Sequence, residues 1–307
     1  MKPDISTGLV DLVTADKSSV KRLEKSADRT HAWLRDTIDS RKRPVGDALP
    51  PLFASVPPLE PEQQSFYLSD LQGDFEPDLS GLCVYSPQTV AALPTALGHL
   101  PRLCLSAPET PHTLLTAISL GIDLITTPFV TETSEHGIAL SFEFPPPKNA
   151  DHQALGFDLW SGAHATDLSP LTPACSCYTC TRHHRAYVHH LLQAKEMLAW
   201  TLLQIHNHSV IDTFFRKIRE SMARGTFEDD VNAFSRVYEA EMPEKTGQGP
   251  RVRGYQMKSI GGGEPKRNPK VYGRLDDQVQ KLAEAQSGVA TLGGDAEELE
   301  ENGFAKG

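Results

Sequence analysis

Apolar residues are scarce in this chain of 307 residues, and long apolar runs are missing. They make up 39% of the sequence, somewhat below the share usual for globular domains, which indicates that part of the chain stays outside a packed core. No run of 18 or more apolar residues occurs, which excludes a membrane-spanning helix. The N-terminus lacks the apolar stretch of a secretory signal, so we expect a cytoplasmic protein without an integral membrane segment.

Cysteine is also rare, and its distribution argues against a disulfide framework. The chain has five cysteines, and three of them, Cys175, Cys177 and Cys180, fall within six residues. In a cytosolic chain such a cluster favours metal binding over disulfide formation. The other two, Cys83 and Cys104, lie in short apolar runs and are expected to be small core residues.

The net charge of −10 is unevenly distributed along the chain. Residues 1–174 carry 12 basic and 22 acidic side chains, residues 175–274 carry 16 and 10, and residues 275–307 carry 2 and 8. The average charge argues against a nucleic-acid binder. The middle segment, which also holds six of the twelve His, is the only plausible site for a polyanion, although solvated helix surfaces explain the same charges.

Short apolar runs alternate with helix-like stretches in the first half of the chain, and Pro, Gly or Asp bound most of the runs. This alternation predicts βα units around a parallel sheet, and therefore an α/β protein. The last of the runs is the candidate for one strand of a hairpin. The predicted strands are 49–56, 81–86, 101–107, 122–130 and 137–144, and the predicted helices are 16–40, 62–71, 88–97 and 108–121.

Helices are predicted to dominate from residue 182 to residue 240. Gly225 should end one of them, and Thr226 with Asp229 is a plausible capping box for the next. After about residue 243 the sequence is rich in Gly, Pro and charge, so residues 244–307 are predicted to be mostly disordered, with a short helix at 275–286. Two apolar stripes define the helices, namely Val188, Leu191, Leu192, Leu198, Leu202 and Ile205, then Val210, Ile211, Phe214, Phe215, Ile218 and Met222.

The cysteine cluster predicts a zinc site, because three thiolates close in sequence can converge on one ion, and zinc takes a fourth ligand to complete a tetrahedron. His206 is the best fourth ligand, since it ends an apolar helical stripe that can fix its position. One straight helix from Cys180 to His206 would span about 39 Å, so the chain must fold back near residues 193–197. With four protein ligands the zinc is structural. Free buried thiols are the alternative, and the pairs His183–His184 and His189–His190 are expected to pack or to lie on the surface.

Residues 175–227 resemble the zinc-binding region of the tRNA-guanine transglycosylases. That family carries Cys-x-Cys-x-x-Cys and a later His-Asn pair, which match Cys175, Cys177, Cys180 and His206 here. A weaker resemblance extends over residues 5–240. It implies a (β/α)8 TIM-type barrel with an inserted helical zinc-binding subdomain and one structural Zn²⁺ per chain.

The resemblance also divides the chain. It implies a partial barrel over residues 1–170, a zinc-binding helical subdomain with closing barrel helices over 171–243, and the mostly disordered tail over 244–307. The match begins partway into the family pattern: residues 3–13 resemble a strand of the barrel's first half, and the early Asp used in proton transfer has no counterpart. We therefore expect an N-terminally truncated barrel, whose open strand edges would need to be covered.

Two departures from the family pattern bear on catalysis. Asp123 matches the first Asp of the family's active strand, but Thr126 stands where the nucleophilic Asp of catalytic members is expected. A threonine hydroxyl without an activating base is a poor substitute for a carboxylate. Residues 52–61 replace the family's glycine-rich loop with a proline-rich one, which hinders the approach of a base to the backbone. No catalytic residue is therefore predicted.

These departures resemble the non-catalytic, accessory branch of the eukaryotic queuine-inserting members. Such a subunit pairs with a catalytic paralogue, and the heterodimer exchanges guanine for queuine at the tRNA wobble position. The resemblance implies a cytoplasmic protein that can also sit on the mitochondrial outer surface. Besides residues 251–270, the candidate phosphate contacts are Arg182, Arg185, Arg216, Lys217, Arg219 and Arg224.

Two other functions stay open at this stage. One is an active transglycosylase that uses another carboxylate, such as Asp123. The other is a zinc-stabilised interaction module, or a degenerate fragment, with no role in RNA chemistry. A guanine-exchange assay with an Asp123 variant distinguishes an active transglycosylase from the accessory role. A tRNA-binding titration distinguishes an interaction module or degenerate fragment from the accessory role.

Overall fold

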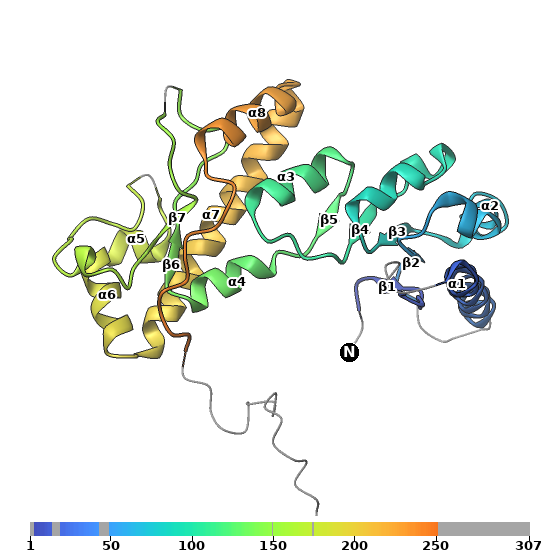
Figure 1. The fold of residues 1–307 in the computed structure, drawn as a ribbon, viewed down its shortest axis with the longest axis horizontal. Coiled ribbons are helices and arrows are strands. Elements are labelled where there is room, and N and C mark those ends of the chain that lie inside the picture. The colour runs from blue at the N-terminus through green and yellow to red at the C-terminus, as the bar shows by residue number, and fades with distance from the viewer. Residues whose placement is uncertain (1–2, 14–18, 43–48, 149, 174, 251–307) are drawn as a thin grey trace, which may run out of the picture. The chain divides into compact units, whose positions relative to one another are not determined.

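The computed structural model describes residues 3–13, 19–42, 49–148, 150–173 and 175–250. The strands within these residues form two sheets (Figure 1). The larger sheet is parallel, curls as half of a barrel, and has the order β1-β2-β3-β4-β5. The smaller sheet is an antiparallel pair. The strands are β1 (Ser6–Thr7), β2 (Leu52–Val56), β3 (Gly81–Val84), β4 (Arg102–Cys104), β5 (Leu124–Ile125), β6 (Ile138–Leu140) and β7 (Gly156–Asp158).

Helices connect the parallel strands and make up most of the described residues after β7. Short 3-10 turns lie at Pro61–Gln64 (η2), Glu76–Asp78 (η3), Pro87–Ala92 (η4), Thr95–His99 (η5) and Gly162–His164 (η6). The α-helices are α1 (Val20–Arg41), α2 (Ser65–Leu71), α3 (Pro111–Ser119), α4 (Pro128–Glu135), α5 (Tyr178–Arg182), α6 (Arg185–Gln193), α7 (Met197–Arg224) and α8 (Phe227–Val237).

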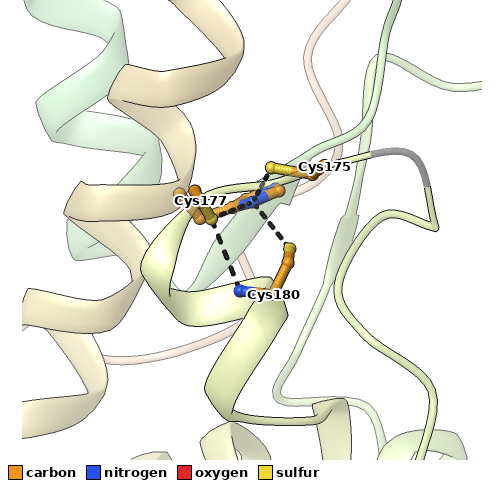
Figure 2. Close-up of side chains that lie close together, drawn as sticks. Cys175, Cys177 and Cys180 are labelled. Carbon is orange, nitrogen blue, oxygen red and sulfur yellow. Dashed lines mark hydrogen bonds between the residues drawn. The ribbon is translucent and has the colours of Figure 1, made fainter.

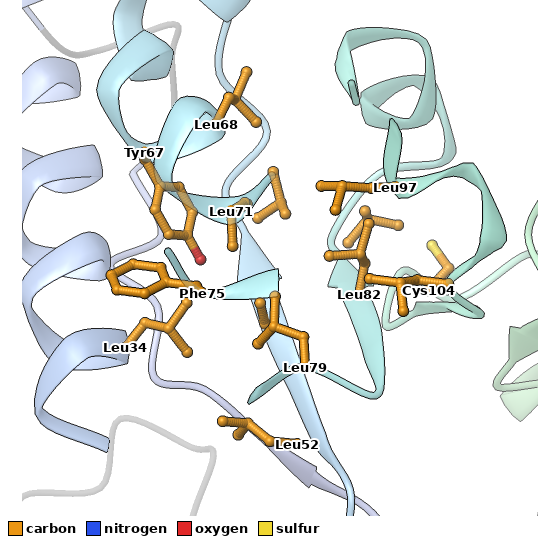
Figure 3. Close-up of a cluster of buried hydrophobic side chains, with 14 of the residues drawn as sticks. Leu34, Leu52, Tyr67, Leu68, Leu71, Phe75, Leu79, Leu82, Leu97 and Cys104 are labelled. Atoms are coloured by element: carbon orange, nitrogen blue, oxygen red, sulfur yellow. The ribbon is translucent and has the colours of Figure 1, made fainter. Parts of the chain in front are cut away.

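The core of the larger sheet lies between its strands and the helices α1 and α2 (Figure 3). All residues of β2 and β3 are buried, as expected for parallel strands that are covered on both faces. Leu34 of α1, Leu71 of α2 and Leu82 of β3 belong to one apolar cluster. Cys83 and Cys104 are both fully buried, so the prediction that they are core residues is confirmed.

The predicted alternation of strands and helices is confirmed, but two predicted elements are wrong. Residues 88–97 form the 3-10 turns η4 and η5 instead of a helix, because Pro94 holds the preceding Leu93 in an extended conformation (ψ 140°). The strand predicted over 122–130 is only Leu124–Ile125, because Pro128 starts α4 at a position where its missing N–H costs little.

The predicted helices of the second half are present with different details. The turn between α6 and α7 falls within residues 193–197, as predicted, and Gly225 ends α7 with φ 71°. Leu198 and Ile205, however, are 45% and 38% exposed, because the buried face of α7 passes through Leu202 and His206. The Thr226–Asp229 capping box is also wrong. Thr226 Oγ1 instead donates to a carboxylate oxygen of Asp230 at 2.9 Å.

The segment after α8 runs back across the smaller sheet. Glu239 N–H donates to the Gln153 carbonyl at 3.0 Å, and Thr246 Oγ1 donates to Asp158. Gly247 lies directly against the indole of Trp160, where a Cβ would come within 1.8 Å of the ring. Residues 244–250 of the predicted tail are therefore described and contact the smaller sheet through Thr246 and Gly247, although most of them are exposed, whereas residues 251–307, with the predicted helix 275–286, lie outside the described residues.

Candidate metal centre

Three helices bring the cluster together. Cys177 is the N-cap of α5, and its sulfur accepts the backbone N–H of Cys180 at 3.4 Å, which keeps the two residues within the first turn of the helix. The α6–α7 hairpin then reverses the chain, with Lys195 in the left-handed region at φ 57°. This reversal places the middle of α7, and with it His206, against α5. A further bond, from Thr179 Oγ1 to the Leu202 carbonyl at 2.7 Å, ties α5 to α7.

Cys175, Cys177, Cys180 and His206 converge on one point, as Figure 2 illustrates for the cysteines. The Nδ1 atom of His206 lies 3.7, 3.7 and 3.4 Å from the three sulfur atoms, in the order of the chain. The four ligand atoms all lie within 4.8 Å of one another. His206 is fully buried, whereas the cysteines are half-buried.

The tautomer of His206 suits a metal ligand. Its Nε2 lies 2.9 Å from the Leu140 carbonyl, and because a carbonyl can only accept, Nε2 carries the proton. In the neutral ring Nδ1 then has a lone pair, which faces three sulfurs. A carbonyl that orients a ligand His in this way is usual at metal centres.

The distances pass a simple test for zinc. Zn–S bonds of about 2.3 Å and Zn–N bonds of about 2.0–2.1 Å at tetrahedral angles put a nitrogen about 3.5 Å from each sulfur. The observed separations of 3.4–3.7 Å agree with that value. A single N–H cannot serve three thiols as a donor at once, so shared coordination accounts for the convergence better than hydrogen bonding does.

The electrostatics of the cluster favour a positive charge at its centre. Burial by itself lowers the pKa of His206, but hydrogen bonding to the three cysteines outweighs it and raises the pKa to about 11. The same contact with His206 lowers the pKa of Cys175 to about 6. Without a metal ion these shifts favour a proton at the central position, and a cation bound there would take its place.

The histidines of the two pairs differ in their surroundings: three contact neighbouring groups and one is exposed. His183 stacks on Tyr187 with ring centroids 5.0 Å apart, and the side chain of His184 accepts the Tyr187 N–H at the start of α6. His189 is buried with Nδ1 2.8 Å from the Leu159 carbonyl, and His190 is exposed. The expectation that these residues pack or lie on the surface is confirmed.

The predicted phosphate contacts differ in availability. Arg185 is used internally: it bonds to Asp167 and to two backbone carbonyls, and its guanidinium lies over the ring of Phe157 at 4.4 Å. Arg182 and Arg219 are exposed. The remaining three form ion pairs with acidic side chains of α7 and α8, namely Arg216 and Lys217 with Glu220, and Arg224 with Asp230. Residues 251–270 lie outside the described residues.

The two positions that bear on catalysis lie at opposite ends of β5. Asp123 precedes the strand, and its carboxylate accepts the backbone N–H of Arg102 at 2.9 Å, at the start of β4. Thr126 directly follows the strand and is exposed. Thr126 therefore lies at the carboxyl end of β5, the end at which βα barrels carry their active sites, and Asp123 lies at the other end.

Fold and site together define an α/β protein with a curled parallel sheet and a Cys3His centre on helices that follow the sheet. The family model described as "TGT: Queuine tRNA-ribosyltransferase" matches residues 1–240. The chain therefore belongs to the queuine tRNA-ribosyltransferase (TGT) family.

Several similar curated proteins carry the name "Queuine tRNA-ribosyltransferase accessory subunit 2". The protein of that name from Schizosaccharomyces pombe is 37% identical over 263 residues, which cover 83% of this chain and 58% of the relative. Those from Drosophila pseudoobscura pseudoobscura and Anopheles gambiae are 32% and 31% identical, covering 73% and 72% of this chain. The chain thus spans little more than half the length of these relatives.

Proposed function

We propose that this protein is the non-catalytic subunit of a heterodimeric queuine tRNA-ribosyltransferase, which supports the exchange of guanine for queuine at the tRNA wobble position. The observation that carries the proposal is the combination of family membership with Thr126 at the carboxyl end of β5. The names of the relatives in three organisms support the same role. The position of Asp123 at the other end of the strand disfavours an active enzyme built on that carboxylate.

The metal is proposed to be one structural Zn²⁺ per chain, held by Cys175, Cys177, Cys180 and His206. Zn²⁺ supplies a fixed tetrahedral crosslink when bound. The chain's own residues then do the structural work: the four ligands tie the loop before α5 to the middle of α7, and Leu140 connects this point to β6. With four protein ligands no position remains for substrate, which agrees with a subunit that takes no part in the chemistry.

The proposed partners are the catalytic paralogue and tRNA. The parallel strands β1–β5 are proposed to form part of a (β/α)8 barrel, with the zinc subdomain inserted near its C-terminal end. The cations Arg182, Arg216, Lys217 and Arg219 are the candidates for phosphate contacts. A cytoplasmic location, including the outer mitochondrial surface, is part of the proposal, and no helix among the described residues is long and apolar enough to cross a membrane.

Reconstitution with the catalytic paralogue tests the proposal. The full chain and the paralogue are co-purified, zinc is counted per complex, and labelled guanine exchange into tRNA is measured for each chain alone and for the pair. We expect a stable pair, zinc in this chain, and exchange only when the paralogue is present.

A variant that separates the alternatives is Asp123→Ala. The pair that contains this variant should exchange guanine at the parent rate, because Asp123 only holds the start of β4. Exchange by the purified chain alone, lost in the Asp123 variant, would instead make the chain an enzyme. A chain that neither pairs with the paralogue nor changes tRNA binding in a salt-dependent manner would favour an interaction module without an RNA role.

A further inference from the structure

Asn207, the residue after His206, is fully buried in the middle of α7 and uses three hydrogen bonds. Its Oδ1 accepts the Leu140 N–H at 2.9 Å. Its Nδ2 donates to the Ile138 carbonyl at 2.9 Å and to Ser134 Oγ at 2.8 Å. These partners lie on β6 and at the end of α4. A buried carboxamide with this many partners fixes its neighbours, because leaving any of them unpaired is costly.

The side of β6 that Asn207 contacts is its free edge. Gly137 and Ser141 bond to the β7 side of the hairpin, through Leu159 N–H and the Leu155 carbonyl, so the polar groups of Ile138 and Leu140 point away from it. Asn207 accepts from one of these residues and donates to the other, as the backbone of an adjacent strand would. At this edge of β6 the carboxamide of Asn207 therefore makes the hydrogen bonds that an adjacent strand would make.

Leu140 is consequently held through both of its backbone polar groups by neighbouring residues of α7. Asn207 accepts from its N–H, and His206 donates to its carbonyl from Nε2. The carbonyl is the group that fixes the tautomer of His206 and directs Nδ1 to the three sulfurs. Any shift of Leu140 would change the orientation of the ring.

We propose that Asn207 is a positioning residue for the metal centre: it holds Leu140 in the place from which the Leu140 carbonyl orients His206. The inference rests on metal binding by the four ligands, as in the proposed function, and goes beyond it by assigning a residue that touches neither the metal nor a ligand side chain. Groups that hold a metal ligand in place without touching the metal typically contribute about 10–100-fold to metal affinity, so a change at Asn207 should be measurable.

Metal affinity of full-length variants tests the assignment. Asn207→Leu keeps the approximate size of the side chain and removes all three bonds, whereas Ser134→Ala removes one partner of Asn207 and leaves Leu140 held. Zinc affinity is measured by competition with a chromophoric chelator, and the coordination geometry is followed by the absorption bands of Co²⁺ in place of zinc. We expect about a 10–100-fold loss of affinity and altered Co²⁺ bands for Asn207→Leu, with neither change for Ser134→Ala.

A third variant keeps the test decisive if Asn207→Leu does not fold. Asn207→Asp retains an oxygen that accepts from Leu140 and loses both donated bonds, so its metal affinity should stay within a few-fold of the parent. A tenfold or larger loss for Asn207→Asp, or an unchanged affinity for a folded Asn207→Leu, would overturn the assignment. A parent chain that binds no metal would overturn the zinc proposal as well, and this outcome is distinguishable because it needs no variant.

Discussion

One imidazole connects the candidate metal centre to the rest of the protein. His206 faces three sulfurs through Nδ1 and the Leu140 carbonyl through Nε2, so it belongs to the cluster and to the edge of β6 at once. Its full burial means that it cannot exchange either partner for water. Removing the ring therefore has two separate effects, the loss of a ligand and an unpaired carbonyl.

At the residue scale, His206→Ala should abolish tight metal binding. We expect the zinc affinity to fall by at least about 100-fold, the upper end of the loss seen for an outer partner, because a direct ligand is removed. His208→Ala is the matched control, since His208 is exposed on the same helix two residues later. Its affinity should equal that of the parent. Equal affinities for both variants would mean that His206 is not a ligand.

The sequence predicted the four members of this cluster because the spacing of three cysteines and the end of an apolar stripe are visible in it. It could not predict Leu140, whose contribution to the site is a backbone carbonyl and so is independent of the side chain. It also could not show that Arg185 turns inward to Asp167 and Phe157, because nothing local distinguishes Arg185 from the exposed Arg182.

At the scale of elements, the end of the long helix α7 depends on a single glycine. Gly225 has φ 71°, and no atom lies within 4 Å of a Cβ built on it, so a substitution there is limited by backbone conformation alone. Gly225→Ala should lower the free energy of unfolding by about 1–2 kcal/mol, the cost of the left-handed region for an L-residue. Chemical denaturation measures this change.

Gly162→Ala is the control for that experiment. A Cβ at Gly162 also meets nothing within 4 Å, but its φ lies outside the left-handed region. Its free energy of unfolding should stay within about 0.5 kcal/mol of the parent, as for most surface substitutions. If both variants lose the same amount, the conformation of Gly225 is not what ends α7.

Metal removal should loosen particular elements and leave others intact. The candidate ligands lie just before and within α5 and on α7, and His206 contacts β6, whereas the core around β2 and β3 belongs to a separate apolar cluster. Without a metal ion the three thiols and the His206 ring are no longer fixed to one point, so the hydrogen bond from His206 to the Leu140 carbonyl should weaken. Hydrogen exchange after chelation should therefore rise in α5 and β6 and stay unchanged in β2 and β3. Uniform acceleration along the chain would contradict this.

The elements that the sequence predicted correctly are those with strong periodicity and clear ends. In the helix over Val20–Arg41 a buried residue recurs at every third or fourth position, and β2 and β3 are short continuous buried runs that begin next to Pro or at Gly. Pro94 and Pro128 account for the two errors. Each changes the backbone of its neighbours, an effect that apolar periodicity does not register.

At the scale of the whole molecule, the distribution of charge along the chain matters more for RNA binding than the net charge does. The chain is acidic overall with a net charge of −10, yet residues 175–274 carry more basic than acidic side chains. Within the described part of that segment, Arg216, Lys217 and Arg219 lie in the C-terminal half of α7, the helix that also carries the metal ligand candidate His206. If the proposed heterodimer binds tRNA, these cations of α7 are candidates for its phosphate contacts on this subunit.

The salt dependence of tRNA binding by the reconstituted pair tests that expectation. A triple variant, Arg216→Gln, Lys217→Gln and Arg219→Gln, should weaken binding and reduce the slope of log K against log salt by about 1 for each lost phosphate contact. The control replaces Lys21 and Lys25, which are exposed on α1, by Gln, and its change of slope is compared per charge removed. If the control reduces the slope as much as the triple variant, the effect follows net charge and α7 has no special place in RNA binding.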